Sequence, residues 1–168
     1  METLAGRIQG VHHIGISVPD IAKAREFYID LLGATEEVAP FSWPQGSAFI
    51  DTVVGLKDSA AHQFMCRLGN TNLEIFEYTN PRSAPQDPDR GVQNFGYTHF
   101  ALQVDDILAV HDRLVAAGIR VHTPPNMAGI KTGPDGIKRG FAATYCRDFC
   151  GNVFEIMEIH DCEDMKRV

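Results

Sequence analysis

The sequence HIGISVPDI at residues 13–21 recurs as HFALQVDDI at residues 99–107, with His, Val, Asp and Ile at matching positions. A second pair of similar segments follows, LEIFE at 73–77 and FEIME at 154–158. The two pairs occur in the same order, at offsets of 86 and 81 residues. Because similar segments at a nearly fixed period indicate a repeated structural unit, the sequence predicts a duplicated module.

Each module is expected to begin with a strand, continue with a helix and end with three strands. Apolar and polar residues alternate over 11–18, which indicates a strand. Asp20 and Asp106 stand where a helix N-cap is expected, and Gly33 and Gly118 where each helix should end. The later strands are predicted over 47–54, 63–68 and 72–78 in the first half, and over 120–123, 141–146 and 153–159 in the second. The expected fold class is α+β, with two tandem βαβββ modules forming a cup-shaped mixed sheet whose helices lie on the outer face.

The 168 residues suit a single domain spanning 1–168. Its expected parts are a first module over about 10–79, a proline-rich linker over 80–94, a second module over about 95–160 and a C-terminal tail over 161–168. The segment 123–140 is longer than an ordinary connection and carries Lys131, Lys138 and Arg139 in an acidic chain. It is interpreted either as a cationic lid over an anionic substrate or as a solvated mobile loop.

The composition excludes several classes of protein. A net charge of −7 argues against binding to nucleic acid or to an anionic membrane. No apolar run approaches the ~18 residues of a membrane span, and residues 1–10 lack the apolar core of a secretory signal. The four cysteines form no Cys-x-x-Cys pair, which favours reduced thiols and a cytoplasmic location.

The repeat also places chemically useful side chains on one surface. His13 and His99 stand early in the first strand of each half, and Glu74 and Glu155 stand in the last. Strand alternation directs all four away from the apolar positions that the helices should cover, and therefore toward the concave surface. Carboxylates on half-buried strands need a partner, and no Lys or Arg of matching phase lies nearby in the repeat. A divalent cation satisfies both carboxylates and both imidazoles.

These motifs, together with Phe27-Tyr28 and Leu32-Gly33, resemble the vicinal oxygen chelate superfamily, over about residues 10–160. That superfamily includes glyoxalase I, methylmalonyl-CoA epimerase, extradiol dioxygenases, and fosfomycin and bleomycin resistance proteins. The resemblance implies paired βαβββ modules around one divalent metal ion, which is Ni, Co, Mn, Fe or Zn. It also implies a homodimer that often contributes to the site.

Carried over by position, the resemblance makes His13, Glu74, His99 and Glu155 the metal ligands, in a pattern similar to glyoxalase I. A metal chelated by two neighbouring substrate oxygens stabilises an enediolate or enolate, while a carboxylate beside it moves a proton. Glu155, or alternatively Glu74, is the expected proton shuttle. The carboxylate that the methylmalonyl-CoA epimerase branch adds has no counterpart at 43–46.

The resulting hypothesis is a glyoxalase-like lyase, isomerase or epimerase acting on a small, anionic, oxygenated molecule. Two alternatives stay open: an Fe(II) extradiol-type dioxygenase, and a small-molecule binding or resistance protein without catalysis. The residues expected to contact the substrate carry charged or phenolic side chains on the predicted strands and lid; they are Arg67, Lys131, Lys138, Arg139 and Tyr145.

Overall fold

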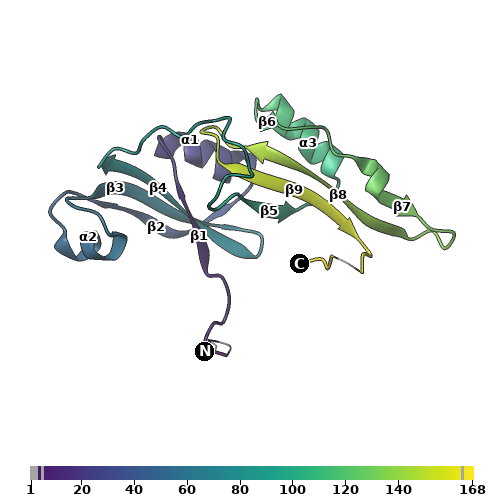
Figure 1. Cartoon of the computed structure of the whole chain (residues 1–168), viewed down its shortest axis with the longest axis horizontal. Coiled ribbons are helices and arrows are strands. Elements are labelled where there is room, and N and C mark those ends of the chain that lie inside the picture. The colour runs from purple at the N-terminus through teal and green to yellow at the C-terminus, as the bar shows by residue number, and fades with distance from the viewer. Residues whose placement is uncertain (1–3, 5, 164) are drawn as a thin grey trace. The chain divides into compact units, whose positions relative to one another are not determined.

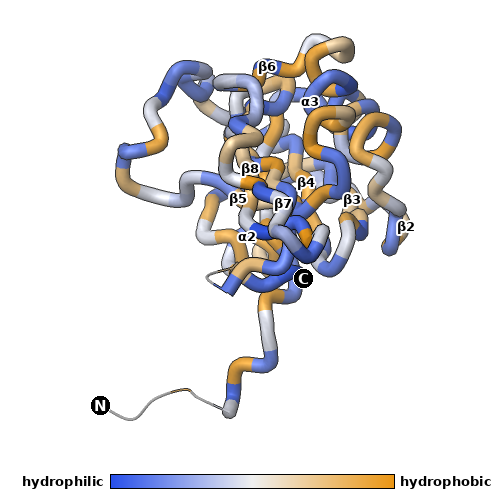
Figure 2. The backbone as a smooth tube through the Cα atoms, turned by 90° about the vertical axis from the view of Figure 1, so that its right-hand side faces the viewer, coloured by the Kyte–Doolittle hydropathy of each residue, from blue (hydrophilic) through white to orange (hydrophobic). Residues whose placement is uncertain are grey.

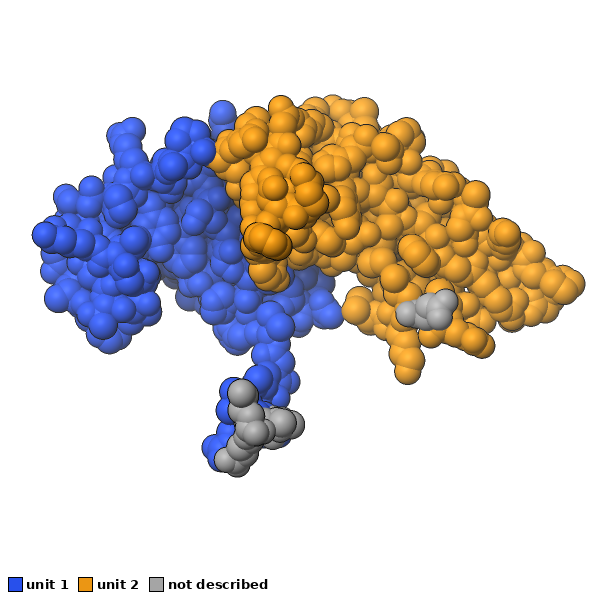
Figure 3. All heavy atoms as spheres, viewed as in Figure 1, with its two compact units in different colours: residues 1–85 blue, residues 86–168 orange. Residues whose placement is uncertain are grey.

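The computed structural model describes residues 4, 6–163 and 165–168. The chain divides into two compact units, residues 1–85 and residues 86–168, which Figure 3 shows in different colours. The boundary falls within the segment 80–94. Each unit contains its own sheet and helices, in the mixed α+β class that the repeat predicts.

Unit 1 consists of a four-stranded sheet and the helices that connect some of its strands along the chain (Figure 1). The strand order is β1-β4-β3-β2, with β1 parallel to β4 and the other neighbours antiparallel. In chain order the elements are β1 (His13–Ser17), α1 (Ile21–Arg25), the π-helical η1 (Glu26–Leu31), β2 (Thr35–Trp43), α2 (Ala48–Val54), β3 (Ala60–Leu68) and β4 (Thr71–Asn80).

Unit 2 repeats this plan with one additional short strand. Its sheet has the order β5-β9-β8-β6, again with the first strand parallel to the last, and β7 pairs with β8 outside this path. In chain order the elements are β5 (His99–Gln103), α3 (Ile107–Ala116), β6 (Arg120–Val121), the 3-10 helix η2 (Met127–Gly129), β7 (Ile130–Thr132), β8 (Lys138–Arg147) and β9 (Val153–His160).

The predicted helix ends are confirmed in both units. The Asp20 carboxylate accepts hydrogen bonds from the N–H groups of Ala22 and Lys23, at 2.9 and 3.0 Å. Asp106 accepts one from the N–H of Ala109, at 3.2 Å. Gly33 and Gly118 follow the helices with φ of +77° and +76°, a left-handed conformation that glycine adopts without steric cost.

The expectation of a strand over 47–54 is wrong, because residues 48–54 form α2. Ser47 caps this helix, and Gly55 ends it with a left-handed φ of 69°. The strand of that position in the module is β2, Thr35–Trp43, which the sequence did not reveal. All of its residues except Trp43 are exposed, and β-bulges interrupt its pairing with β3. An exposed edge strand lacks the alternation of apolar residues by which strands are recognised.

The segment 123–140 is more regular than expected. Residues 127–132 form η2 and β7, and β7 pairs antiparallel with the start of β8, so that Lys131 lies opposite Arg139. The predicted irregular connection is thus partly a β-hairpin.

Apolar side chains fill the space between each sheet and its helix. Leu73 and Ile75 of β4 are fully buried, and Phe154 and Ile156 of β9 are only 1% exposed. In unit 1 helix α1 packs on β4, and in unit 2 helix α3 packs on β9 and β6 (Figure 1). This packing assigns one face of each sheet to the core and leaves the opposite face available for a site.

Hydrophobic and hydrophilic residues are interspersed along the backbone (Figure 2). Among the described residues, no helix has the length and apolar character needed to cross a membrane. All four cysteines are free thiols.

Candidate metal centre

Parallel pairing of the first and last strands brings a histidine and a glutamate together in unit 1. Gly15 of β1 lies opposite Glu74 of β4 in the register. His13 comes two residues before Gly15, so His13 and Glu74 lie on the same face of the sheet. The Nε2 atom of His13 lies 3.0 Å from Oε2 of Glu74. The Glu74 side chain is 22% exposed and that of His13 39%. The pair therefore lies on an accessible surface and outside the helix-covered core.

Unit 2 contains the equivalent pair in the equivalent register. Ala101 of β5 lies opposite Glu155 of β9, and His99 is again two residues earlier. The Nε2 atom of His99 lies 3.2 Å from Oε2 of Glu155, with side chains 25% and 17% exposed. The four residues predicted as metal ligands thus form two His–Glu pairs of the same geometry, one in each unit.

The two carboxylates differ in one contact. The side-chain amide Nε2 of Gln63 donates a hydrogen bond of 2.8 Å to Oε1 of Glu74. Gln63 lies on β3 opposite Phe76, whereas the equivalent position on β8, opposite Met157, is Ala143. Alanine has no donor to offer Glu155. Sequence reasoning missed Gln63, because nothing in the motif marks it.

An aromatic cluster lies beside the pair in unit 1. Trp43 of β2 contacts Phe76 and Tyr78 of β4 edge to face, and Phe76 stacks on Tyr78 with centroids 5.7 Å apart. Burial and the neighbouring charge of Glu74 raise the pKa of Tyr78 above its ordinary value. Phe76 follows Glu74 by two residues on β4, so these rings form an apolar wall on the sheet face that carries the pair.

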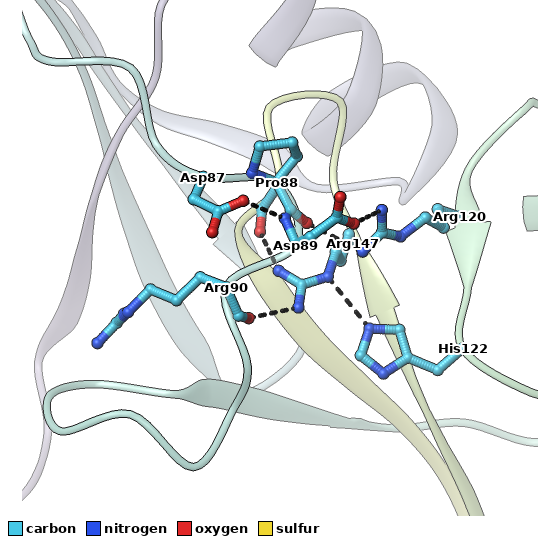
Figure 4. Close-up of polar contacts among 8 residues, drawn as sticks. Asp87, Pro88, Asp89, Arg90, Arg120, His122 and Arg147 are labelled. Atoms are coloured by element: carbon cyan, nitrogen blue, oxygen red, sulfur yellow. Dashed lines mark hydrogen bonds and ion pairs between the residues drawn. The ribbon is translucent and has the colours of Figure 1, made fainter.

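In unit 2 the wall is a single tyrosine between two histidines. The ring of Tyr145, one of the predicted substrate-contacting residues, lies 4.6 Å from that of His99 and 6.0 Å from that of His122. Nε2 of His122 accepts a hydrogen bond of 3.2 Å from Nε of Arg147 (Figure 4). Burial, together with the charges of Arg147 and Arg120, lowers the pKa of His122. This histidine is therefore neutral at pH 7.

Arg147 itself has a structural role in unit 2, where it binds backbone carbonyl oxygens. It is only 4% exposed, and its guanidinium donates to the carbonyl oxygens of Gly151 and Arg90, at 3.0 and 2.7 Å (Figure 4). Nearby, Arg120 binds Asp89 at 2.6 Å and the carbonyl of Pro88 at 2.9 Å. These contacts attach residues 88–90 to strands β6 and β8.

The other residues expected to contact a substrate are dispersed. Arg67 lies at the end of β3, and its Nε donates to the carbonyl of Gly69 at 3.0 Å. Arg139 forms ion pairs with Asp135 and Asp161, at 2.8 and 3.4 Å. Lys131 and Lys138 are exposed, and strand alternation places Lys138 on the opposite sheet face from Arg139. Asp135 and Asp161 thus offset part of the positive charge of the hairpin.

Two further glutamates, Glu77 and Glu158, have a structural role that strand phase alone did not suggest. Oε2 of Glu77 accepts a hydrogen bond of 3.0 Å from the N–H of Ile21, and Oε2 of Glu158 accepts one of 2.8 Å from the N–H of Ile107. Each carboxylate therefore binds the first residue of the helix that covers its own sheet. Their recurrence within the second repeated motif is the sequence signal that marks them.

The donor set of the two pairs fits a divalent cation. The facing atoms of each pair, an imidazole nitrogen and a carboxylate oxygen, are both of a type that a divalent cation would bind. Their separations of 3.0 and 3.2 Å are those of hydrogen bonds, and no group of three or more His, Cys, Asp or Glu side chains suited to a metal ion occurs among the described residues. Beside His13, Oδ1 of Asn72 is buried without a hydrogen-bond partner in the described part of the chain. Each pair thus offers one imidazole nitrogen and one carboxylate oxygen, the mixed ligand types that divalent transition metals accept.

Comparison with known proteins identifies a family. Residues 10–156 match the family model described as Glyoxalase/Bleomycin resistance protein/Dioxygenase superfamily. A 2-epi-5-epi-valiolone epimerase from Actinomyces sp is 34% identical over 122 residues, which cover 68% of this chain and 63% of the relative. The mitochondrial methylmalonyl-CoA epimerase of Mus musculus is 27% identical over 106 residues, 59% of this chain and 48% of the relative. The matched part thus spans less than two thirds of either epimerase.

Solved structures agree on the fold. A glyoxalase family protein from Bacillus cereus superposes with a TM-score of 0.76 at 16% identity, over 95% of this chain and 99% of that one. The fosfomycin resistance protein FosX from Listeria monocytogenes, in complex with Mn(II) and sulfate, gives a TM-score of 0.53 at 18% identity, over 90% and 93% of the two chains. At these identities the comparison concerns the fold alone.

Proposed function

The chain belongs to the glyoxalase/bleomycin resistance protein/dioxygenase superfamily, and on that premise we propose that it is a divalent-metal-dependent isomerase or epimerase. The observation that carries the proposal is the pair of His–Glu contacts at 3.0 and 3.2 Å, repeated on the helix-free face of each unit. The two epimerases among its relatives support this reaction class over oxygen activation.

The proposed metal ligands are His13, Glu74, His99 and Glu155, the residues that the family resemblance assigns to a divalent cation. When bound, the cation stabilises the negative charge that develops on a substrate oxygen as a neighbouring C–H bond is broken. The metal donors from the protein are then two imidazole nitrogens and two carboxylate oxygens.

Glu155 is the proposed proton shuttle. Gln63 donates a hydrogen bond to Glu74, which fixes the orientation of that carboxylate. Glu155 lacks an equivalent amide donor, because Ala143 occupies the corresponding position. Its carboxylate is therefore the one that is able to accept a proton from one face of a substrate carbon and return it to the other. Tyr145, beside His99, offers a hydroxyl to a substrate oxygen.

The proposed substrate is a small, anionic, oxygenated molecule. Trp43, Phe76 and Tyr78 give the site one apolar wall, suited to the carbon skeleton of such a molecule. Lys131 and Arg139, opposite one another on the β7–β8 hairpin, supply positive charge to an otherwise acidic protein. We also propose a homodimer, as the family resemblance implies, with sedimentation at twice the mass of one chain as the test.

Elemental analysis of untagged protein tests the metal site, and deuterium exchange tests the reaction. We expect about one divalent metal per chain in the wild type and a loss of it in His99→Ala. In D₂O, NMR should show exchange at the carbon next to the carbonyl of small anionic hydroxy-ketones, including cyclic ones. Glu155→Gln should keep the metal and lower the exchange rate by about 10²–10⁴-fold.

Three outcomes would contradict this proposal. A wild type that binds no metal, even after reloading, leaves only a small-molecule binding protein. Oxygen uptake with a catechol and iron would indicate the dioxygenase instead. Unchanged exchange in Glu155→Gln would remove that residue from the reaction.

A further inference from the structure

The residue immediately before each of the two candidate ligand histidines contacts that histidine. Oγ1 of Thr98 lies 3.0 Å from Nδ1 of His99. At the equivalent position in the other unit, Nδ1 of His12 lies 2.8 Å from Nδ1 of His13. In both units, then, the histidine is held at its two nitrogens, by a glutamate at Nε2 and by the preceding side chain at Nδ1.

The two contacts of each histidine are chemically linked through its tautomer. A neutral imidazole has one N–H donor and one acceptor nitrogen. An ionised carboxylate only accepts, so a hydrogen bond to Glu155 requires the proton of His99 to be on Nε2. Nδ1 is then an acceptor, and Thr98 must donate its hydroxyl proton. The same reasoning makes His12 the donor to His13.

Metal binding requires the opposite arrangement. A histidine that binds metal through Nε2 uses the lone pair of that atom, and its remaining proton is on Nδ1. The group that faces Nδ1 must now accept a hydrogen bond. A carboxylate or a backbone carbonyl at this position would serve only this second state.

We propose that Thr98 and His12 are positioning residues that change from donor to acceptor when their neighbouring histidines bind metal. A hydroxyl both donates and accepts, and a neutral imidazole does so by exchanging its own tautomer. The ring proton of His99 moves from Nε2 to Nδ1 through solvent, so the number of protons on the ring is unchanged. The two residues differ in type but share this property, and they occupy equivalent positions in the repeat.

The inference rests on the proposed function, because it requires the histidines to be metal ligands. Its consequence is that the metal-free protein keeps each His–Glu pair in place without locking the ring in the tautomer that excludes metal. Thr98 is exposed, so its substitution should not disturb the core.

The test compares Thr98→Val, which has the same shape without the hydroxyl, with Thr98→Ser, which retains it. Thr35→Val, on exposed strand β2, is the matched control. Zn²⁺ is titrated into each protein by calorimetry at pH 8, where an ordinary imidazole is neutral. We expect Thr98→Val to weaken Zn²⁺ binding by about 10–100-fold, and Thr98→Ser and Thr35→Val to bind like the wild type.

Nitrogen-15 NMR of the His99 ring provides a second, independent measurement. The proton should be on Nε2 in the metal-free wild type and on Nδ1 in the Zn²⁺-loaded protein. The loaded Nδ1 proton should exchange slowly with solvent in the wild type and in Thr98→Ser, and rapidly in Thr98→Val. A role in folding alone would not produce this pattern.

Two results would overturn the inference while leaving the metal site intact. These are wild-type Zn²⁺ affinity in Thr98→Val, and a metal-free wild type whose His99 already has its proton on Nδ1. If the wild type binds no Zn²⁺, the proposed function fails as well, so the two failures are distinguishable.

Discussion

Gln63 is the side chain that distinguishes the His–Glu pair of unit 1 from the similar pair of unit 2. Its amide fixes one carboxylate oxygen of Glu74, while the equivalent residue Ala143 leaves Glu155 without such a contact. A duplicated motif would otherwise give two interchangeable carboxylates. In the proposed reaction, this difference assigns Glu74 to a permanent ligand role and Glu155 to proton transfer.

The substitution Gln63→Ala gives unit 1 the residue that unit 2 has at the equivalent position, Ala143. We expect it to weaken metal binding by about 10–100-fold, because Glu74 loses the partner that orients it. At saturating metal the proton exchange rate should stay close to the wild-type value. Calorimetric metal titration and deuterium exchange measure the two effects separately. Gln45→Ala, on the exposed turn after β2, controls for the loss of a glutamine. A fall in exchange rate with unchanged metal affinity would assign Gln63 to the reaction itself.

Among the elements, helix α3 depends on a carboxylate from the strand beneath it. Burial opposes the ionised form of Glu158, but hydrogen bonds from the Ile107 N–H and from His160, and the charges of His160 and Lys138, outweigh it. The pKa of Glu158 is therefore lower in the folded protein than its ordinary value of 4.5. Its stabilising contribution is complete above that value and is lost as the pH falls through the folded pKa.

We therefore expect Glu158→Gln to lower the free energy of unfolding at pH 7 by about 1–3 kcal/mol, since the Ile107 N–H loses a charged acceptor. The difference from the wild type should shrink as the pH falls below 4.5, because Glu158 is protonated there first in the unfolded chain and only at lower pH in the folded protein. Urea unfolding at pH 7, 5 and 3.5 provides the measurement. Glu163→Gln, in the exposed tail, should have no effect at any pH. A constant difference across this range would contradict the role of the charge.

Strand β8 holds the loop that precedes β5 through Arg147. Replacement of this buried arginine by methionine removes donors from the carbonyl oxygens of Gly151 and Arg90 and from His122. We expect Arg147→Met to lower the free energy of unfolding by roughly 1–3 kcal/mol. It should also raise the pKa of His122 toward its ordinary value, since the charge of Arg147 contributes to the present lowering.

The half-exposed Arg120, with an ion pair to Asp89, is the matched control for Arg147. Its replacement by methionine should cost no more than about 1 kcal/mol. Chemical denaturation gives the stabilities, and NMR titration gives the pKa of His122. Equal losses from the two substitutions would argue against a special role for the buried guanidinium.

At the level of elements, the sequence predicted strands and helix caps whose patterns recur in both halves, and it missed elements whose pattern does not recur. Strands β1, β4, β5 and β9 and both helix caps were predicted, because apolar alternation and capping residues recur in both halves. Helix α2 and strand β2 have no such support, and an exposed edge strand lacks the periodic signal. The two His–Glu pairs were predictable from strand phase, whereas Gln63, Thr98 and His12 depend on register and contacts that phase does not reveal.

Across the whole molecule, three of the four thiols are protected. Burial raises the pKa of Cys66 to about 11 and that of Cys146 to about 12, and burial together with Asp148 raises that of Cys150 to about 12. At pH 8 these groups are protonated and unreactive, because the thiolate is the nucleophile. We expect a chromogenic thiol reagent to modify one residue rapidly, Cys162 in the C-terminal tail, and all four in denaturant. Cys162→Ser should abolish the rapid phase, and a rapid phase that persists would indicate opening of the sheets.

The parallel pairing of each unit's first strand with its last has a consequence for protein synthesis. His13 leaves the ribosome long before Glu74, and His99 long before Glu155, so neither pair exists until nearly all of its unit has been made. Such contacts between distant residues form late in folding. A nascent chain that stops before Thr71 lacks the partner strand of β1, so it leaves His13 without its carboxylate. Each ligand pair of the proposed metal centre is therefore complete only once its half of the chain has been translated.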